Sequence, residues 1–296
     1  MQSTQDGMKF NDKRDLCNNS DLRNKSASPL PFQSQTEERI EESVASYSAL
    51  TQSKLIAAKN QRVRTHGFEP PFSFAQVSSW VLAVVLFITF IIALICLVRI
   101  ENEQSETLFT LCILTITYLI SYGSMVVYTY RVTISDPTDP TVALERAYHA
   151  QMKFEDSRNN SVSFQTKDYQ FYCDICDTHV LPDTKHCQMC NRCSYDFDHH
   201  CQWVSNDIGG ANYKDFIRML TSVAATLIVQ LIVVSMELTS LKKLDEAELE
   251  KRKFLLWTCI ASLVLTGLFF LADAYLLIFH IYLIYNDLST YKYIRN

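Results

Sequence analysis

Four long runs of apolar residues divide the chain, and mostly polar segments separate them. The first two runs, residues 77–98 and 108–127, contain no charged side chain. The third and fourth cover residues 217–236, with Arg218 at the start, and residues 254–284. A helix of about twenty apolar residues spans the hydrocarbon core of a bilayer. The pattern therefore predicts an all-α polytopic membrane protein with four transmembrane helices.

The fourth run is longer than one perpendicular span needs, and it contains Asp273 and His280. Ionisable residues inside a membrane are energetically costly, so both are candidate functional residues. Alternatively, one or both lie at the membrane interface, because the run exceeds the hydrocarbon thickness. The sequence leaves both interpretations open.

The segments outside the runs are polar. Residues 1–60 are rich in Ser, Gln, Asn, Lys and Glu and poor in large apolar side chains, which is typical of a disordered tail. Within this tail, residues 36–59 favour a charged helix. Residues 141–170 predict a short amphipathic helix followed by a polar loop. No internal repeat is evident.

Four spans place both termini and the loop between the second and third spans on one side of the membrane. The side is predicted to be cytosolic, because basic residues precede the first span, whereas the basic residues of the last loop argue weakly for the opposite orientation. The net charge of −5 and the lack of a basic stripe with interleaved aromatic residues exclude a general nucleic-acid binder. The basic residues before the first span are Lys54, Lys59, Arg62 and Arg64.

A cluster of cysteines and histidines occupies the loop between the second and third runs. Six of the ten cysteines and four of the seven histidines lie between Cys173 and Cys201. Such close spacing is typical of metal ligands in a reducing compartment, and a module with so few large apolar residues needs metal to fold. Zinc takes four Cys or His ligands, often from Cys-x2-Cys pairs. The seven plausible ligands are Cys173, Cys176, His186, Cys187, Cys190, Cys193 and His200, and two sites need an eighth, either Asp207 or His179.

The sequence Asp198-His199-His200-Cys201 follows these ligands and suggests a different chemistry. A cysteine becomes a nucleophile when an imidazole activates it and a carboxylate orients that imidazole. From the spacing alone, Cys201 is equally well interpreted as another metal ligand. The membrane setting favours the nucleophile, because a thiolate held beside transmembrane helices can accept an acyl chain whose tail lies in the bilayer. Transfer between thioesters is nearly isoenergetic, and no Gly-x4-Gly-Lys-Ser/Thr nucleotide motif is present.

From Gly67 to Ile294 the chain resembles the DHHC-type protein S-acyltransferases, also called palmitoyltransferases. The resemblance rests on the cysteine and histidine spacing, on Asp198-His199-His200-Cys201, and on residues at the family's positions elsewhere. Asp136-Pro137-Thr138 is similar to the family's Asp-Pro-Gly, and Ser289-Thr290-Tyr291-Lys292 is similar to its Thr-Thr-x-Glu. The remaining matches are Trp203, Asn206, Ile208, Gly209, Asn212 and Phe216.

The resemblance implies a role for each residue of the cluster. One zinc is held by Cys173, Cys176, His186 and Cys193, and a second by Cys187, Cys190, His200 and the residue at position 207. Asp198, His199 and Cys201 form the catalytic set, and Thr290 steadies the aspartate. Cys201 attacks acyl-coenzyme A with His199 as the base, and the acyl group then passes to a substrate cysteine in a ping-pong reaction.

The chain also departs from the family pattern. Asp207 stands where cysteine is usual, and an aspartate oxygen is a harder zinc ligand. Gln202 replaces a proline, and Lys292 replaces a glutamate. Val180 and Asp183 occupy positions where the family often has basic residues, which affects the expected contact with the coenzyme phosphates.

Together these features predict five segments. They are a disordered cytosolic tail (1–66), transmembrane helices 1 and 2 (67–130), a zinc-binding cytosolic cysteine-rich domain (131–216), helices 3 and 4 (217–285) and a short cytosolic tail (286–296). The predicted location is a multi-pass endomembrane protein of the ER or Golgi, with the termini and active site in the cytosol.

The predicted function is protein-cysteine S-palmitoyl transfer from palmitoyl-CoA to cysteines of membrane-associated proteins. The expected partners are those proteins, the acyl-CoA co-substrate and the lipid bilayer, without nucleic acid. The alternative is a catalytically weak relative that serves as a zinc-containing membrane adaptor. A metal transporter is a more distant alternative, because the cysteine cluster lies outside the spans.

Overall fold

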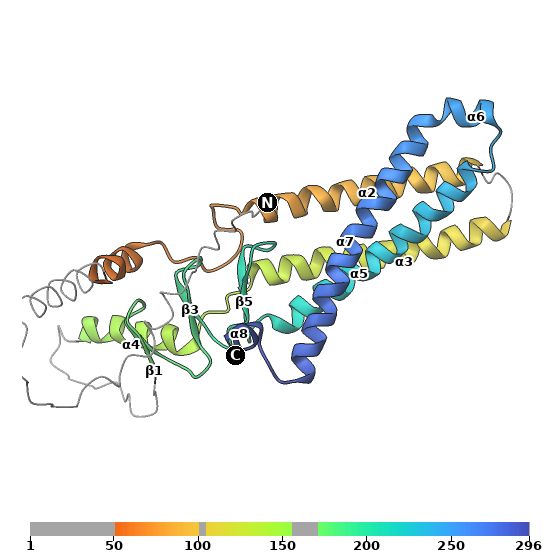
Figure 1. The fold of residues 1–296 in the computed structure, drawn as a ribbon. Helices are drawn as coiled ribbons and strands as arrows, with labels where there is room; N and C mark the ends of the chain where they lie inside the picture. The colour runs from red at the N-terminus through yellow and green to blue at the C-terminus, as the bar shows by residue number, and fades with distance from the viewer. Residues whose placement is uncertain (1–50, 101–104, 156–170, 296) are drawn as a thin grey trace, which may run out of the picture. The chain divides into compact units, whose positions relative to one another are not determined.

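A computed structural model describes residues 51–100, 105–155 and 171–295 (Figure 1). The described chain forms two compact units. One contains residues 51–65, 137–155 and 171–197, and the other contains residues 66–100, 105–136 and 198–295. Residues 51–60 are helical, which agrees with part of the predicted charged helix; the rest of that helix and the polar loop after residue 155 lie outside the described residues.

Four helices of the second unit are long and apolar enough to cross a membrane, as the hydrophobic pattern predicts. They are α2 (Phe74–Ile100), α3 (Ser105–Ile134), α5 (Tyr213–Leu241) and α7 (Lys253–Tyr285), and Figure 1 shows them running alongside one another. Short helices α6 (Glu246–Lys251) and α8 (Thr290–Arg295) flank α7. With 33 residues, α7 is about 50 Å long, roughly 20 Å more than a hydrocarbon core. Its last turns, which include His280, can therefore extend out of the core.

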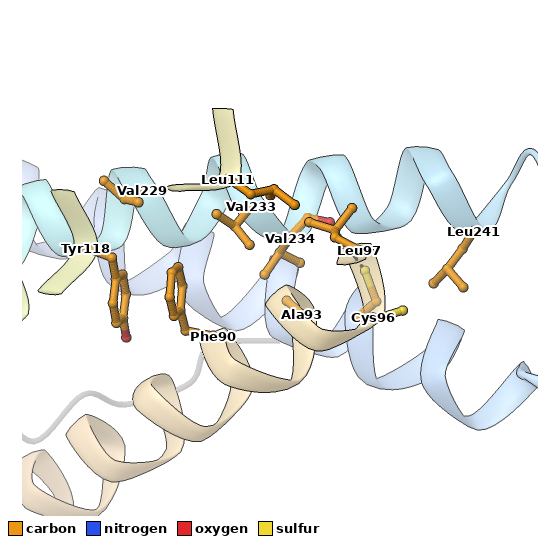
Figure 2. Packing of buried hydrophobic residues seen from close by; sticks show 11 residues of the cluster. Phe90, Ala93, Cys96, Leu97, Leu111, Tyr118, Val229, Val233, Val234 and Leu241 are labelled. Atoms are coloured by element: carbon orange, nitrogen blue, oxygen red, sulfur yellow. Dashed lines mark hydrogen bonds between the residues drawn. The ribbon is translucent and has the colours of Figure 1, made fainter. Parts of the chain in front are cut away.

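Helix α5 contacts α2, α3 and α7, and it is the most deeply buried of the four. In the core, Phe90 of α2 stacks on Tyr118 of α3 with ring centroids 3.6 Å apart, and Val233 of α5 packs nearby (Figure 2). Gln230 of α5 is fully buried, and its amide donates to Thr89 of α2 over 3.1 Å. Side-chain packing and such interhelical hydrogen bonds hold membrane helices together, since lipid tails remove the hydrophobic drive for helix association.

The first unit contains helix α4 (Pro140–Glu155) and two small antiparallel hairpins. Strands β1 (Phe171–Cys173) and β2 (Thr178–Val180) form one hairpin, and β3 (Lys185–Cys187) and β4 (Arg192–Ser194) form the other. Among the described residues of this unit, the buried apolar cluster consists of Val142 and Val180 together with Cys173 and Cys193, and Ile175 and Cys176 pack against it.

A third hairpin, β5 (His199–Cys201) and β6 (Asn206–Ile208), belongs to the second unit. It is tied to α3 by Asn206, whose buried amide donates to the carbonyl oxygens of Val132 and Ser135 over 2.8 Å each. At its turn, Val204 lies against Gly67, and a Cβ on Gly67 would fall 2.0 Å from the Val204 oxygen. Only glycine therefore fits at position 67 without displacing the turn.

The three hairpins form a repeat with a period of 14 residues. Cys173, Cys187 and Cys201 each end a first strand, and each pairs with the residue five positions later. The residue four positions after each cysteine has a positive φ, at Asp177, Asn191 and Ser205. The left-handed conformation of these residues lets the chain turn back after the loop. The repeat is not evident from the sequence, because its third copy lacks the second cysteine: Val204 stands where the first two copies have Cys176 and Cys190.

Candidate active site and metal centre

Within the first unit, Cys173, Cys176, His186 and Cys193 bring their ligand atoms together. The Nδ1 atom of His186 lies 3.4 Å from the sulfur of Cys176, 3.7 Å from that of Cys173 and 3.8 Å from that of Cys193. Tetrahedral zinc, with Zn–S bonds of about 2.3 Å and Zn–N bonds of about 2.0 Å, separates sulfur and nitrogen ligands by about 3.6 Å. The four residues therefore fit a zinc ion, in the grouping that the family resemblance implies.

The side chains of this cluster hold their protons tightly, and a metal ion has to displace those protons. Burial lowers the pKa of His186, but the neighbouring sulfurs of Cys173 and Cys176 outweigh burial and raise it to about 9. Hydrogen bonds to the same two sulfurs raise the pKa of the Cys193 thiol well above its usual range. Crowded thiols resist deprotonation beside one another, and a bound metal ion removes this penalty because thiolates are its ligands.

Two carboxylates, both missed by sequence reasoning, support the cluster. Asp139 is fully buried and accepts hydrogen bonds from the backbone of Thr141 and Leu181 and from the Thr184 hydroxyl, over 2.6–2.8 Å. Glu145 of α4 accepts from the backbone N–H of His179 over 2.6 Å and lies 3.0 Å from its Nδ1. His179, one of the two residues considered as the eighth ligand, thus bonds to Glu145 and is not part of the Cys173 cluster.

Strand β5 explains how adjacent motif residues reach different partners. Successive side chains of a strand point to opposite faces, so His199 and Cys201 share one face and His200 points to the other. His199 Nδ1 lies 2.7 Å from an oxygen of Asp198, and the Cys201 sulfur is close enough to help raise the pKa of His199. A carboxylate only accepts hydrogen bonds, so Nδ1 of His199 carries a proton. Asp198 and His199 of the predicted catalytic set are therefore in contact, and Cys201 lies on the same face of the strand as His199.

Thr290, at the start of α8, also contacts Asp198, but through its main chain. Its backbone N–H donates to the second oxygen of Asp198 over 2.7 Å. Burial raises the pKa of Asp198, but the hydrogen bonds from His199 and Thr290 outweigh burial and hold it below its usual range. Burial lowers the pKa of His199, and the hydrogen bonds and charges of Asp198 and Cys201 raise it to about 9. This environment stabilises an imidazolium beside a cysteine sulfur, the arrangement that activates thiol nucleophiles.

Residues of the transmembrane helices surround this set. Cys201 is 6% exposed and packs in an apolar cluster with Val132 of α3 and Phe216 and Met219 of α5. The Phe216 ring meets the His199 ring edge-on, with centroids 5.3 Å apart. His280 of α7, 1% exposed, has its ring 5.8 Å from that of His199. His280, a candidate from its membrane depth alone, thus lies beside the predicted catalytic set, whereas Asp273 has a buried oxygen without a hydrogen-bond partner among the described residues.

On the other face of β5, His200 pairs with Asp207 of β6. The two residues lie directly opposite each other in the hairpin, with His200 Nδ1 2.8 Å from an Asp207 oxygen. In the repeat, they correspond to His186 and Cys193 of the second hairpin, both of which belong to the first metal cluster. Asp207 therefore occupies a ligand position of the repeat, and it is fully buried.

The departure at Val180 has a structural reason. Val180 is 3% exposed and forms part of the small apolar cluster with Val142, so it faces the interior of its unit. Asp183 has a positive φ of 63° in the turn after β2. Neither position presents a basic side chain to a ligand.

Comparison with known proteins finds similarities in this region. Residues 166–296 match a family model described as DHHC palmitoyltransferase. Probable protein S-acyltransferase 7 of Arabidopsis thaliana is 32% identical over 139 residues, which cover 46% of this chain and 30% of that protein. Palmitoyltransferase ZDHHC5-A of Danio rerio is 31% identical over 123 residues, which cover 40% of this chain and 15% of that protein.

A shorter match has a higher identity: palmitoyltransferase ZDHHC8 of Homo sapiens is 42% identical over 57 residues, which cover 19% of this chain and 8% of that protein. The resemblance predicted from the motifs is thereby confirmed for residues 166–296. The aligned residues span about a third or less of the length of these relatives.

Proposed function

We propose that this protein is a multi-pass membrane S-acyltransferase that moves a long-chain acyl group from acyl-coenzyme A to cysteines of membrane-associated proteins. The observation that supports it most is the contact of Cys201 with two environments. Its sulfur is close enough to His199 to help raise the pKa of that imidazole, and the same residue packs among apolar side chains of the transmembrane helices. A polar activating group and a lipid-like surface at one sulfur suit a substrate that is a thioester at one end and a hydrocarbon at the other.

The proposed reaction has two half-reactions. The Cys201 thiolate attacks the thioester carbonyl carbon of acyl-coenzyme A; the carbon–sulfur bond to coenzyme A breaks, and the coenzyme leaves as a thiol after accepting a proton from His199. In the second half-reaction His199 removes the proton of a substrate thiol, whose sulfur attacks the acyl-Cys201 carbonyl. Cys201 is thereby released, completing a ping-pong cycle. Asp198 keeps the proton on Nδ1 of His199 throughout.

Zinc has a structural role in this proposal. Cys173, Cys176, His186 and Cys193 are proposed to hold one ion, and the fit of their distances supports this. Cys187, Cys190, His200 and Asp207 are proposed to hold a second, an assignment supported by the family resemblance and by the equivalence of Asp207 and Cys193 in the repeat. Bound zinc stabilises small loop-rich modules that lack an apolar core.

The proposed orientation places the cysteine cluster and both termini in the cytosol of an endomembrane. The basic residues Lys54, Lys59, Arg62 and Arg64 before α2 support it. The reduced state needed by a thiolate nucleophile and by thiolate ligands supports it as well.

The decisive experiment uses the purified full chain in detergent with labelled palmitoyl-coenzyme A. The wild type should take up label that hydroxylamine releases, and Cys201→Ser should take up none. Cys112→Ser is the matched control, because Cys112 is an exposed free cysteine on α3, and it should label like the wild type. Equal label on Cys201→Ser, or none on a wild type that retains zinc, would contradict the enzyme and favour the adaptor. Transfer from labelled protein to a cysteine peptide on vesicles tests the second half-reaction.

A further inference from the structure

A tyrosine and a histidine from two transmembrane helices form a hydrogen bond next to the catalytic set. The hydroxyl of Tyr213, the first residue of α5, lies 3.0 Å from Nδ1 of His280 near the end of α7. Tyr213 is half-buried and His280 is almost completely buried. A buried imidazole needs hydrogen-bond partners, and Tyr213 supplies one at a defined nitrogen.

His280 is close enough to influence His199 directly. One ligand atom from each of Asp198, His199 and His280 lies within 4.8 Å of the other two. Phe216 contacts both imidazoles edge-on, with centroids 5.3 Å from His199 and 5.0 Å from His280. The His199 ring is thus bounded by Asp198 at Nδ1, by Phe216 at one side and by His280 at another.

The hydrogen bond ties Nδ1 of His280 to Tyr213 in either tautomer of the neutral ring. With its proton on Nε2 the ring accepts from the tyrosine hydroxyl, and with its proton on Nδ1 it donates to that hydroxyl. In both cases the bond fixes the orientation of the His280 ring.

We propose that Tyr213 and His280 are a positioning pair that holds His199 in line with Cys201 during acyl transfer. The inference rests on the proposed function and adds residues from the third and fourth spans to it. Tyr213 holds the rotamer of His280, and His280 and Phe216 confine the His199 ring. Loss of the pair should lower the rate of the chemical step while leaving acyl-coenzyme A binding unchanged, because neither residue is proposed to contact the coenzyme.

The test is single-turnover acylation of Cys201 in the full chain, measured as a function of palmitoyl-coenzyme A concentration. Small displacements of a catalytic group cost up to about 100-fold in rate. Tyr213→Phe should lower the rate at saturation by about 10-fold and His280→Leu by about 100-fold, with half-saturating concentrations within about twofold of wild type. His280→Asn keeps an oxygen that can accept from Tyr213, and it should recover part of the loss. Tyr275→Phe, which removes the hydroxyl of an exposed tyrosine on α7, is the matched control and should behave as wild type.

A second measurement needs no acyl-coenzyme A. The rate at which iodoacetamide alkylates Cys201, followed by mass spectrometry of its peptide, should fall in the same order across the variants. Zinc content and elution volume should match the wild type, which separates positioning from misfolding; Tyr213→Phe is the variant expected to fold normally.

The outcomes separate the two proposals. A wild type that is alkylated at Cys201 but never acylated contradicts the proposed function, and the alkylation series still tests the pair. A normally acylated wild type with an equally fast Tyr213→Phe overturns the positioning pair alone. Variants that raise only the half-saturating concentration and leave the rate at saturation unchanged also overturn the positioning pair. A His280→Asn variant that is no faster than His280→Leu overturns it as well.

Discussion

Two aspartate–histidine pairs lie at the β5–β6 hairpin. Their hydrogen bonds are nearly equal in length, but their connectivity and their surroundings differ. Asp198 and His199 are 2.7 Å apart, and His200 and Asp207 are 2.8 Å apart. The first pair connects neighbouring residues, so it depends on the strand to direct its side chains. The second connects opposite residues of β5 and β6, so hairpin pairing alone brings it together.

The surroundings of each pair determine its chemistry. His199 faces Phe216 and His280 from the transmembrane helices, and Asp198 gains a further N–H donor from Thr290. His200 and Asp207 occupy the positions that hold metal-ligand candidates in the preceding hairpin. A one-residue step along a strand therefore separates a proposed catalytic histidine from a proposed structural one, because alternate side chains enter different environments.

The largest expected effect comes from replacing each of the two histidines, His199 and His200, separately. His199→Ala should lower acylation at least about 100-fold, the usual contribution of a positioned acid–base group, and leave the zinc content unchanged. His200→Ala should release about one zinc per chain, since it removes one of four ligands. Zinc analysis and acylation of both variants check this. Zinc loss from His199→Ala, or full retention by His200→Ala, would break the division between the pairs.

The carboxylate of the first pair is the next test. Asp198→Asn should lower acylation about 100-fold, because an amide that donates to Nδ1 places the imidazole proton on the wrong nitrogen. The single-turnover rate is the measurement, with zinc content as the control for folding. A rate near that of the wild type would mean that the charge and tautomer of this pair are unimportant.

Thr290 provides a finer test, because its contact with Asp198 is made by the backbone. Thr290→Ala keeps the N–H and should retain activity within about threefold, whereas Thr290→Pro removes the donor. A hydrogen bond to a charged group contributes about 1.5–3 kcal/mol, so the proline variant should be slower by at least about 10-fold. Proline suits the first turn of a helix, which limits damage to α8. Equal loss in both variants would assign the role to the hydroxyl instead.

The smallest effect is expected at Asp207. Asp207→Cys places in the third hairpin the residue that Cys193 provides in the second, and it should slow the loss of zinc to a chelator severalfold. The rate of zinc release, followed with a colorimetric indicator, checks this. A faster release would indicate that Asp207 pairs with His200 for another purpose.

Much of this arrangement follows from local sequence. The four spans are evident from apolar runs of sufficient length, and the first metal cluster from its Cys-x2-Cys spacing. The placement of His199 and Cys201 on one face could not be derived from the sequence, because it requires this segment to be an extended strand. Asp139 and Glu145 were not predicted as functional residues, because single acidic residues in polar segments have no distinctive sequence pattern.

Two other features required three dimensions. Tyr213 and His280 are distant in the sequence, and only the packing of α5 against α7 brings them together. Thr290 was expected to steady Asp198, and the donor is its main-chain N–H, which every residue except proline possesses. A sequence motif can therefore mark a residue whose backbone, and not its side chain, makes the contact.

The hairpin repeat carries a consequence for how such a nucleophile can arise. In each of the first two copies, the end of the first strand and the turn after it carry two cysteines. The following copy offers a histidine and a second ligand-type side chain. No further hairpin of this kind follows the third copy among the described residues. The third copy keeps one cysteine, Cys201, and its Val204 packs in the apolar cluster. Among the described residues, Cys201 therefore has no following hairpin with which to share a metal ion. Its place at the end of the array leaves this thiol to the proposed acyl transfer rather than to a metal site.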